Sequence, residues 1–102
     1  MKRYSKDIRG KARKKAMNSY RIVIAPRARK EIDGLPANIK SRIAEVLSNV
    51  LSKDPFTGKA LKAELKGLYS YRVGDYRIIY AVARRELIIQ IVKVMHRREV
   101  YR

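Results

Sequence analysis

The sequence predicts an α+β fold with the element order β-α-α-β-β-β, in which a helical hairpin packs on a small, mostly antiparallel sheet. Three observations support this class. An alternating, β-branched segment spans residues 20–25. Apolar residues recur at helical spacing over 37–51, and three strand-like segments joined by short turns occupy 68–95.

Two helices are expected after the first strand. Pro26 suits the first turn of a helix, where a missing N–H is tolerated, and the segment 34–36 (GLP) ends that helix near Asp33. The second helix spans 37–51, and its apolar residues recur every three or four positions, so they share one face. They are Ile39, Ile43, Val46, Leu47, Val50 and Leu51. The two helices therefore form a hairpin with one apolar side.

A connection and three strands complete the domain. Residues 53–67 contain Asp-Pro and Thr-Gly turn signals and are predicted to be a loop. The predicted strands are 68–73, 76–82 and 87–95. Because the turns at 74–75 and 84–86 are short, these strands must pair antiparallel. The helices cover one face of the sheet and leave the other open.

The hairpin at Gly74-Asp75 places two arginines together. Glycine in the first central position suits a two-residue type II′ turn closed by Val73 and Tyr76. In that register Arg72 lies opposite Arg77, and both point to one face. Like charges in this position cost up to about 1 kcal/mol, which favours a site that holds an anion such as phosphate between them. The alternative is that both side chains extend into solvent.

Charge and composition restrict the function. The 102 residues carry a net charge of +17, with no cysteine and one histidine. This excludes disulfides, a thiolate nucleophile and Cys-ligated or multi-histidine metal sites, so we expect no metal and no cofactor. The sequence has no apolar run long enough to span a membrane and no secretory signal, so a cytoplasmic protein is expected. Its charge favours polyanionic partners.

The N-terminal segment differs from the rest of the chain. Residues 1–16 hold eight basic residues and one acidic residue, with too few apolar residues for a core face. We expect a basic, disordered leader at 1–16 and a self-contained domain at 17–102. An arm that adds phosphate contacts is the functional alternative.

Reactive side chains gather at the C-terminus. The histidine, three arginines, a glutamate and a tyrosine fall within 96–102 (HRREVYR), and the preceding strand ends near Arg77. Cleavage of a phosphodiester by an internal 2′-hydroxyl needs a base, an acid and positive charge around the phosphorus. His96 could be either, since an imidazole can donate or accept a proton, and Tyr101 could be a base if nearby cations lower its pKa. A solvated tail is the alternative interpretation.

Residues 20–102 resemble the RelE/ParE toxin superfamily, and its RelE branch in particular. The signs are YRIVIAPRARKEI, the LP at the helical bend, KALKAELKGLYSYRVGDYRIIY and the ending IVKVMHRREVYR. The resemblance implies a microbial RNase/RelE-like fold and a type II toxin. It further implies a metal-independent endoribonuclease that cleaves mRNA in the ribosomal A site and so inhibits translation. The implied partner is an acidic, RelB-like antitoxin.

The resemblance also implies residue roles. Arg77 would hold the scissile phosphate, and Arg72 would support the phosphate and the reacting oxygen. Arg97 would stabilise the leaving group. Tyr101 would act as base or stack on the nucleotide, and His96 matches a position that is histidine or lysine in relatives.

Further cations are candidate contacts to RNA and the ribosome. They are Lys53, Lys59, Lys62, Lys66 and Arg98. Ser70 departs from the family pattern, because relatives often carry a lysine or arginine there. Either Arg72 does the work of two cations, or a lysine such as Lys66 compensates.

Two other functions remain open from the sequence. One is the ParE branch, whose members poison DNA gyrase without cleaving nucleic acid. The other is a basic RNA- or DNA-binding module without catalysis. The terminal cluster at 96–102 favours the nuclease, because a gyrase poison needs no acid or base.

Overall fold

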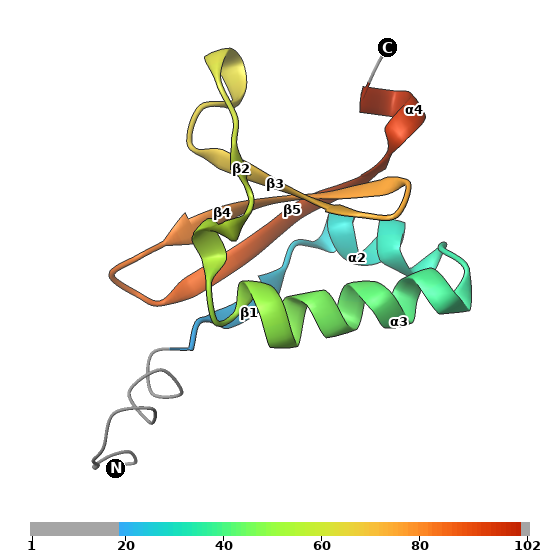
Figure 1. The fold of residues 1–102 in the computed structure, drawn as a ribbon, viewed down its shortest axis with the longest axis horizontal. Helices are drawn as coiled ribbons and strands as arrows, with labels where there is room; N and C mark the ends of the chain where they lie inside the picture. Colours follow the sequence, from blue (N-terminus) through green and yellow to red (C-terminus); the bar gives the residue numbers. More distant parts are fainter. Residues whose placement is uncertain (1–18, 101–102) are drawn as a thin grey trace.

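One mixed sheet covered on one face by two helices forms the domain (Figure 1). The computed structural model describes residues 19–100, with side chains through Arg98, so the expected leader at 1–16 and Tyr101 lie outside the described residues. The strands are β1 (Arg21–Ile24), β2 (Lys59–Ala60), β3 (Leu68–Val73), β4 (Tyr76–Ala83) and β5 (Ile88–His96). The helices are α2 (Pro26–Asp33), α3 (Ala37–Val46) and α4 (Arg97–Val100).

The strand order is β1-β5-β4-β3-β2. β1 runs parallel to β5 and every other neighbouring pair is antiparallel, so the predicted α+β class with a mostly antiparallel sheet is confirmed. The predicted order lacked β2, which lies within the expected loop 53–67. β2 pairs Lys59 with Ser70 and Ala60 with Tyr69 at the sheet edge. Two residues are too few for an alternating pattern, so the sequence carried no sign of this strand.

Both predicted helices form where expected. α2 begins at Pro26 and ends where the N–H of Gly34 donates to the carbonyl of Lys30 (3.3 Å). The predicted second helix comprises α3 and its continuation η2 (Leu47–Leu51), which has the wider spacing of a π-helix. At this point the hydroxyls of Ser48 and Ser52 donate to carbonyls one turn back, an interaction that bends helices.

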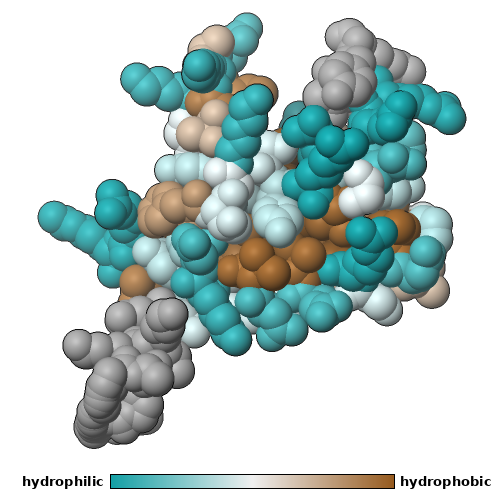
Figure 2. Space-filling view, in the orientation of Figure 1, coloured by the Kyte–Doolittle hydropathy of each residue, from teal (hydrophilic) through white to brown (hydrophobic). Residues whose placement is uncertain are grey.

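The core lies between the helices and the inner face of the sheet. Its sheet residues are Val73, Ile78, Tyr80, Ile89, Ile91 and Val94. Its helix residues are Ala28, Ile32, Ile43, Leu47 and Leu51. Figure 2 shows part of the hydrophobic layer as a band between the sheet and α3. None of the helices in residues 19–100 is long and apolar enough to cross a membrane.

A β-bulge in β5 decides which of its side chains face outward. Ile79 pairs with Lys93 while Tyr80 pairs with Ile91, which leaves Val92 as the extra residue. Before the bulge Ile91 faces the core, and after it Val94 does so. Lys93 therefore lies on the outer face.

A carboxylate joins α2 to β5 beyond the end of β1. β1 pairs with residues 88–91 of β5 only, so the backbone of Val94 has no strand on that side. Oε1 of Glu31 accepts a hydrogen bond from the N–H of Val94 (2.8 Å), and Oε2 accepts one from Nε of Arg27 (3.0 Å). Glu31 thus satisfies a donor at the open part of the sheet edge.

Candidate functional site

The outer face of the sheet, opposite α2 and α3, carries the candidate site. Directly paired residues share a face, so the strand register arranges outward side chains in rows across the sheet. One row is Lys59, Ser70, Ile79 and Lys93, and the next is Arg72, Arg77 and Met95. Four of these outward residues are basic: Lys59, Arg72, Arg77 and Lys93.

The hairpin has the predicted geometry. Val73 pairs with Tyr76 and Arg72 with Arg77. Gly74 has φ +61°, whereas Asp75 is not among the positive-φ residues of the described chain, as a type II′ turn requires. A side chain at Gly74 would also approach Nη1 of Arg42, from α3, to 3.2 Å.

Two projections flank the outer face. The segment from β2 to the turn η4 (Ala63–Leu65) rises on one side and α4 on the other (Figure 1). A pocket of about 340 Å³ is lined by Thr57, Gly58, Lys59, Ser70, Tyr71, Arg72 and Arg77. A pocket of about 120 Å³ is lined by Arg72, Gly74, Asp75, Tyr76, Arg77 and Arg97. Arg72 and Arg77 therefore border both pockets.

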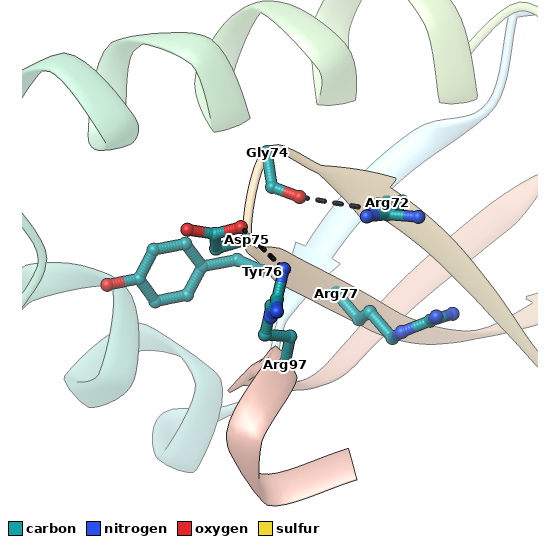
Figure 3. Close-up of a pocket in the computed structure, with 6 residues that line it drawn as sticks. All are labelled: Arg72, Gly74, Asp75, Tyr76, Arg77 and Arg97. Carbon is teal, nitrogen blue, oxygen red and sulfur yellow. Dashed lines mark hydrogen bonds and ion pairs between the residues drawn. The ribbon is translucent and has the colours of Figure 1, made fainter. Parts of the chain in front are cut away.

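The hairpin turn orients the arginines of the smaller pocket (Figure 3). Nε of Arg72 donates to the carbonyl of Gly74 (3.3 Å), which leaves its other N–H groups available. The backbone N–H of Arg97 donates to the carbonyl of Asp75 (2.7 Å), and Nη1 of Arg97 lies 3.7 Å from Oδ1 of Asp75. In Figure 3 the side chains of Arg72 and Arg77 extend side by side, away from Arg97.

This arrangement suits a polyanion. Asp75 is the one carboxylate among the residues that line these two pockets. Arg77 is half-buried on a regular strand, so its backbone position is fixed before any ligand binds. The guanidinium groups of Arg72 and Arg77, which are paired across β3 and β4, can donate to different oxygens of one phosphate.

The structure separates the expected C-terminal cluster. Arg97 joins Arg72 and Arg77, as the sequence predicted. His96 is the partner of Tyr76 and lies on the opposite face of the sheet from Arg77, where its ring meets that of Tyr76 edge-on at 5.0 Å. Its Nδ1 accepts a hydrogen bond from the N–H of Arg98 (3.1 Å). Arg98 is exposed on α4.

The lysines of the connection divide into two groups. Lys59 lines the larger pocket beside Ser70. Lys53, Lys62 and Lys66 are exposed and line none of the pockets around Arg77.

Lys93 is a candidate site residue that the sequence did not indicate. It is half-buried and lines a pocket of about 180 Å³ with Ser70 and Arg77. The available signal was a single charge inside the apolar strand IIQIVKVMH. Lys93 faces outward because of the bulge at Val92, and the alternation of apolar and polar residues in the sequence does not reveal that bulge.

Tyr80 anchors the loop that leads into β2, the strand that carries Lys59. Its hydroxyl is buried and donates to the carbonyl of Pro55 (2.8 Å). Burial raises the pKa of Tyr80 to about 12, although a hydrogen bond with the backbone of Gly58 partly opposes this effect. Phe56 packs its ring edge-on against Tyr69 at 5.6 Å, so the same loop is held at a second point.

Comparison with known proteins identifies the family. A family model described as the ParE toxin of the type II toxin–antitoxin system parDE matches residues 22–101. Toxin RelG of Mycobacterium tuberculosis is 33% identical over 84 residues, which cover 81% of this chain and 97% of RelG.

Solved structures show the same fold. A chain of the toxin–antitoxin complex RelBE2 from M. tuberculosis superposes with a TM-score of 0.73 at 32% identity, covering 76% of this chain and 98% of that one. A chain of the archaeal RelE–RelB complex from Pyrococcus horikoshii OT3 gives a TM-score of 0.64 at 32% identity, covering 78% and 96%. The chain therefore belongs to the RelE/ParE superfamily of toxins from type II toxin–antitoxin systems.

Proposed function

We propose that this toxin is a ribosome-dependent endoribonuclease that cleaves mRNA in the A site without a metal ion and so inhibits translation. The observation that carries the proposal is that Arg72, Arg77 and Arg97, from three different elements, line one small pocket. A toxin that acts on a phosphodiester needs such a group of donors, because negative charge accumulates on the phosphoryl oxygens during the reaction.

The proposed reaction uses the substrate's own nucleophile. The 2′-oxygen loses its proton to a base and attacks the adjacent phosphorus, while the bond from phosphorus to the 5′-oxygen breaks and that oxygen gains a proton from an acid. The products are a 2′,3′-cyclic phosphate and a 5′-hydroxyl end. Arg77 and Arg72 hold the phosphoryl oxygens, and Arg97 stabilises the leaving oxygen.

His96 and Tyr101 are the proposed candidates for proton transfer. His96 faces away from Arg77 and packs on Tyr76, so a direct role requires that α4 and the end of β5 shift when RNA binds. Comparison of His96→Gln with Tyr101→Phe separates the roles. The substitution that abolishes the dependence of the cleavage rate on pH near neutrality removes the group that transfers the proton.

An acidic, RelB-like antitoxin is the proposed partner that keeps the toxin inactive. Two structures with this fold are complexes of a toxin with its antitoxin. The net charge of +17 favours an acidic partner, because such a partner relieves the repulsion among the basic side chains. A small acidic reading frame beside this one should restore growth on co-expression and bind the purified toxin. Failure of every neighbouring product to bind would contradict this part of the proposal.

Mapping of mRNA ends tests the function. Purified toxin is added to a translating extract, and the 5′ ends of the mRNA are mapped. Codon-phased cuts in ribosome-bound mRNA, with little cutting of free RNA, are expected. Because magnesium maintains ribosomes, EDTA is added only to preformed complexes, and cleavage should persist.

A parallel gyrase assay addresses the second candidate function, which the description of the matching family model favours. Inhibited supercoiling together with intact mRNA would replace the nuclease proposal by gyrase poisoning. Binding to RNA with neither effect would indicate a non-catalytic module.

A further inference from the structure

A second part of the outer face lies next to the arginine pair. Ser70 on β3, Ile79 on β4 and Lys93 on β5 are partners in one row across three strands. Together with Leu61, Leu65, Arg77 and Met95 they line a pocket of about 180 Å³. None of these lining residues is a carboxylate, so the positive charge of Lys93 is not neutralised within the pocket.

The hydroxyl of Ser70 is buried beside this pocket and lacks a hydrogen-bond partner. Ser70 is only 4% exposed, and its Oγ is the one buried side-chain polar atom without a hydrogen-bond partner among the described residues. A buried hydroxyl without a partner destabilises a fold, so Ser70 requires a hydrogen-bond partner that the described residues do not supply. Ser70 lines this pocket and also the larger one beside Lys59.

The spacing of the two rows fits neighbouring phosphates of one strand. Ser70 and Arg72 are two residues apart on β3, so their rows are separated by about 6.6 Å along the strand. Successive phosphates of an extended RNA strand have a comparable spacing. A phosphate held between Arg72 and Arg77 therefore places its neighbour over Ser70 and Lys93. The apolar side chains of Leu61 and Met95 offer a surface for the intervening sugar and base.

We propose that Ser70 and Lys93 form a second phosphate subsite, which binds the RNA phosphate next to the scissile one. Ser70 donates one neutral hydrogen bond, and Lys93 supplies the positive charge that Ser70 itself lacks. The identity of the ligand rests on the proposed function, since RNA is the substrate assumed for the arginine pair.

Binding of short, non-cleavable RNAs tests this subsite independently of catalysis. The probes are a 2′-O-methyl dinucleotide, with one phosphate, and a 2′-O-methyl trinucleotide, with two. The purified toxin should bind the trinucleotide more tightly in an NMR titration. The second phosphate should steepen the dependence of log K on log salt by about 0.7.

Three variants and one control separate the two subsites. Lys93→Ala should abolish the advantage of the trinucleotide and its added salt dependence, with dinucleotide affinity within about twofold of the parent's. Ser70→Ala should weaken trinucleotide binding roughly two- to tenfold, as expected for one hydrogen bond. Arg77→Ala should weaken both probes. Lys40→Ala removes an exposed lysine from α3 on the other side of the sheet and should change neither.

The outcomes are distinct from those of the cleavage assay. Unchanged trinucleotide binding in both Lys93→Ala and Ser70→Ala, or no trinucleotide advantage in the parent, overturns the second subsite even if the toxin cleaves mRNA. If the trinucleotide advantage is observed and Lys93→Ala abolishes it, but the toxin cleaves no mRNA, only the nuclease proposal is overturned. Lys93→Gln, which keeps much of the side-chain length, should behave like Lys93→Ala and guards against a local packing effect.

Discussion

Arg72 and Arg77 lie directly opposite each other on β3 and β4, with both side chains on the outer face of the sheet. The one acidic residue that lines their shared pocket is Asp75, and its Oδ1 lies 3.7 Å from Nη1 of Arg97 instead. Opposed like charges destabilise a sheet. The fold therefore maintains an unfavourable pair at the place where an anion would relieve it.

Removal of one arginine should stabilise the free protein. Arg72→Thr places a β-branched residue on the strand and abolishes the repulsion, so the free energy of unfolding should rise by up to about 1 kcal/mol in low salt. Urea unfolding in low salt measures this change in the free energy of unfolding. Added sulfate should stabilise the parent more than the variant, because the anion binds between the two guanidinium groups. A parent that sulfate stabilises no more than Arg72→Thr would show that the pair holds no anion.

Gly58 should not tolerate a side chain. A β-carbon there would collide with the hydroxyl of Tyr80 and lie 2.9 Å from the carbonyl oxygen of Ser70. Gly58→Ala should lower the free energy of unfolding by roughly 1–3 kcal/mol, the range for overpacking. The double variant with Tyr80→Phe should recover part of this loss, since one of the two clashes is removed. Gly34→Ala, whose β-carbon would meet nothing closer than 3.8 Å, is the control.

The Tyr80 hydroxyl should make stability depend on alkaline pH. Burial raises the pKa of Tyr80 to about 12, above its value of about 10 in the unfolded chain. Its contribution is therefore fully present below pH 10 and is lost as the pH rises from about 10 through 12. Tyr80→Phe should be about 1 kcal/mol less stable at neutral pH, because the bond to Pro55 is lost. Urea unfolding at several pH values should show this gap closing above pH 10. A gap that stays constant to pH 11 would contradict the assignment.

Glu31 should stabilise the fold through the backbone rather than through its ion pair. Its carboxylate accepts from the N–H of Val94, on the side of β5 where β1 no longer pairs. Glu31→Ala should cost about 1–3 kcal/mol, the range for a donor left unsatisfied. Glu31→Gln keeps an acceptor oxygen and should cost less. Arg27→Ala removes only the exposed side of the ion pair, so its effect should stay below about 1 kcal/mol. Equal losses in Glu31→Ala and Arg27→Ala would contradict this account.

Local signals explain which parts of the fold were predictable. Pro26 and the segment 34–36 mark the ends of α2, and Gly74 sets the hairpin register, because each acts on neighbouring backbone. The opposition of Arg72 and Arg77 follows from that register alone. β2 and η2 were not predictable, since two residues show no period and the buried Leu47 and Leu51, four residues apart, fit an α-helix equally well.

The second row of the site depended on long-range pairing. Lys59, Ser70 and Lys93 come from three strands, and their alignment requires the register of β2, β3, β4 and β5 together with the bulge at Val92. The sequence-based prediction placed His96 near Arg77 because it treated residues 96–102 as one cluster. Strand alternation instead puts His96 with Tyr76 on one face and Arg77 on the other.

Single-turnover cleavage of mRNA on ribosomes saturated with toxin tests the central claim, which is that the scissile phosphate lies at Arg72 and Arg77. Arg77→Ala should lower the cleavage rate about 10²–10³-fold and leave ribosome binding nearly intact, because it removes one preorganised donor to the transition state. Lys62→Ala removes an exposed lysine and should do the reverse, with weaker, less salt-dependent binding and an unchanged saturated rate. Cleavage by Arg77→Ala at the parental rate would contradict the placement of the phosphate at this pair.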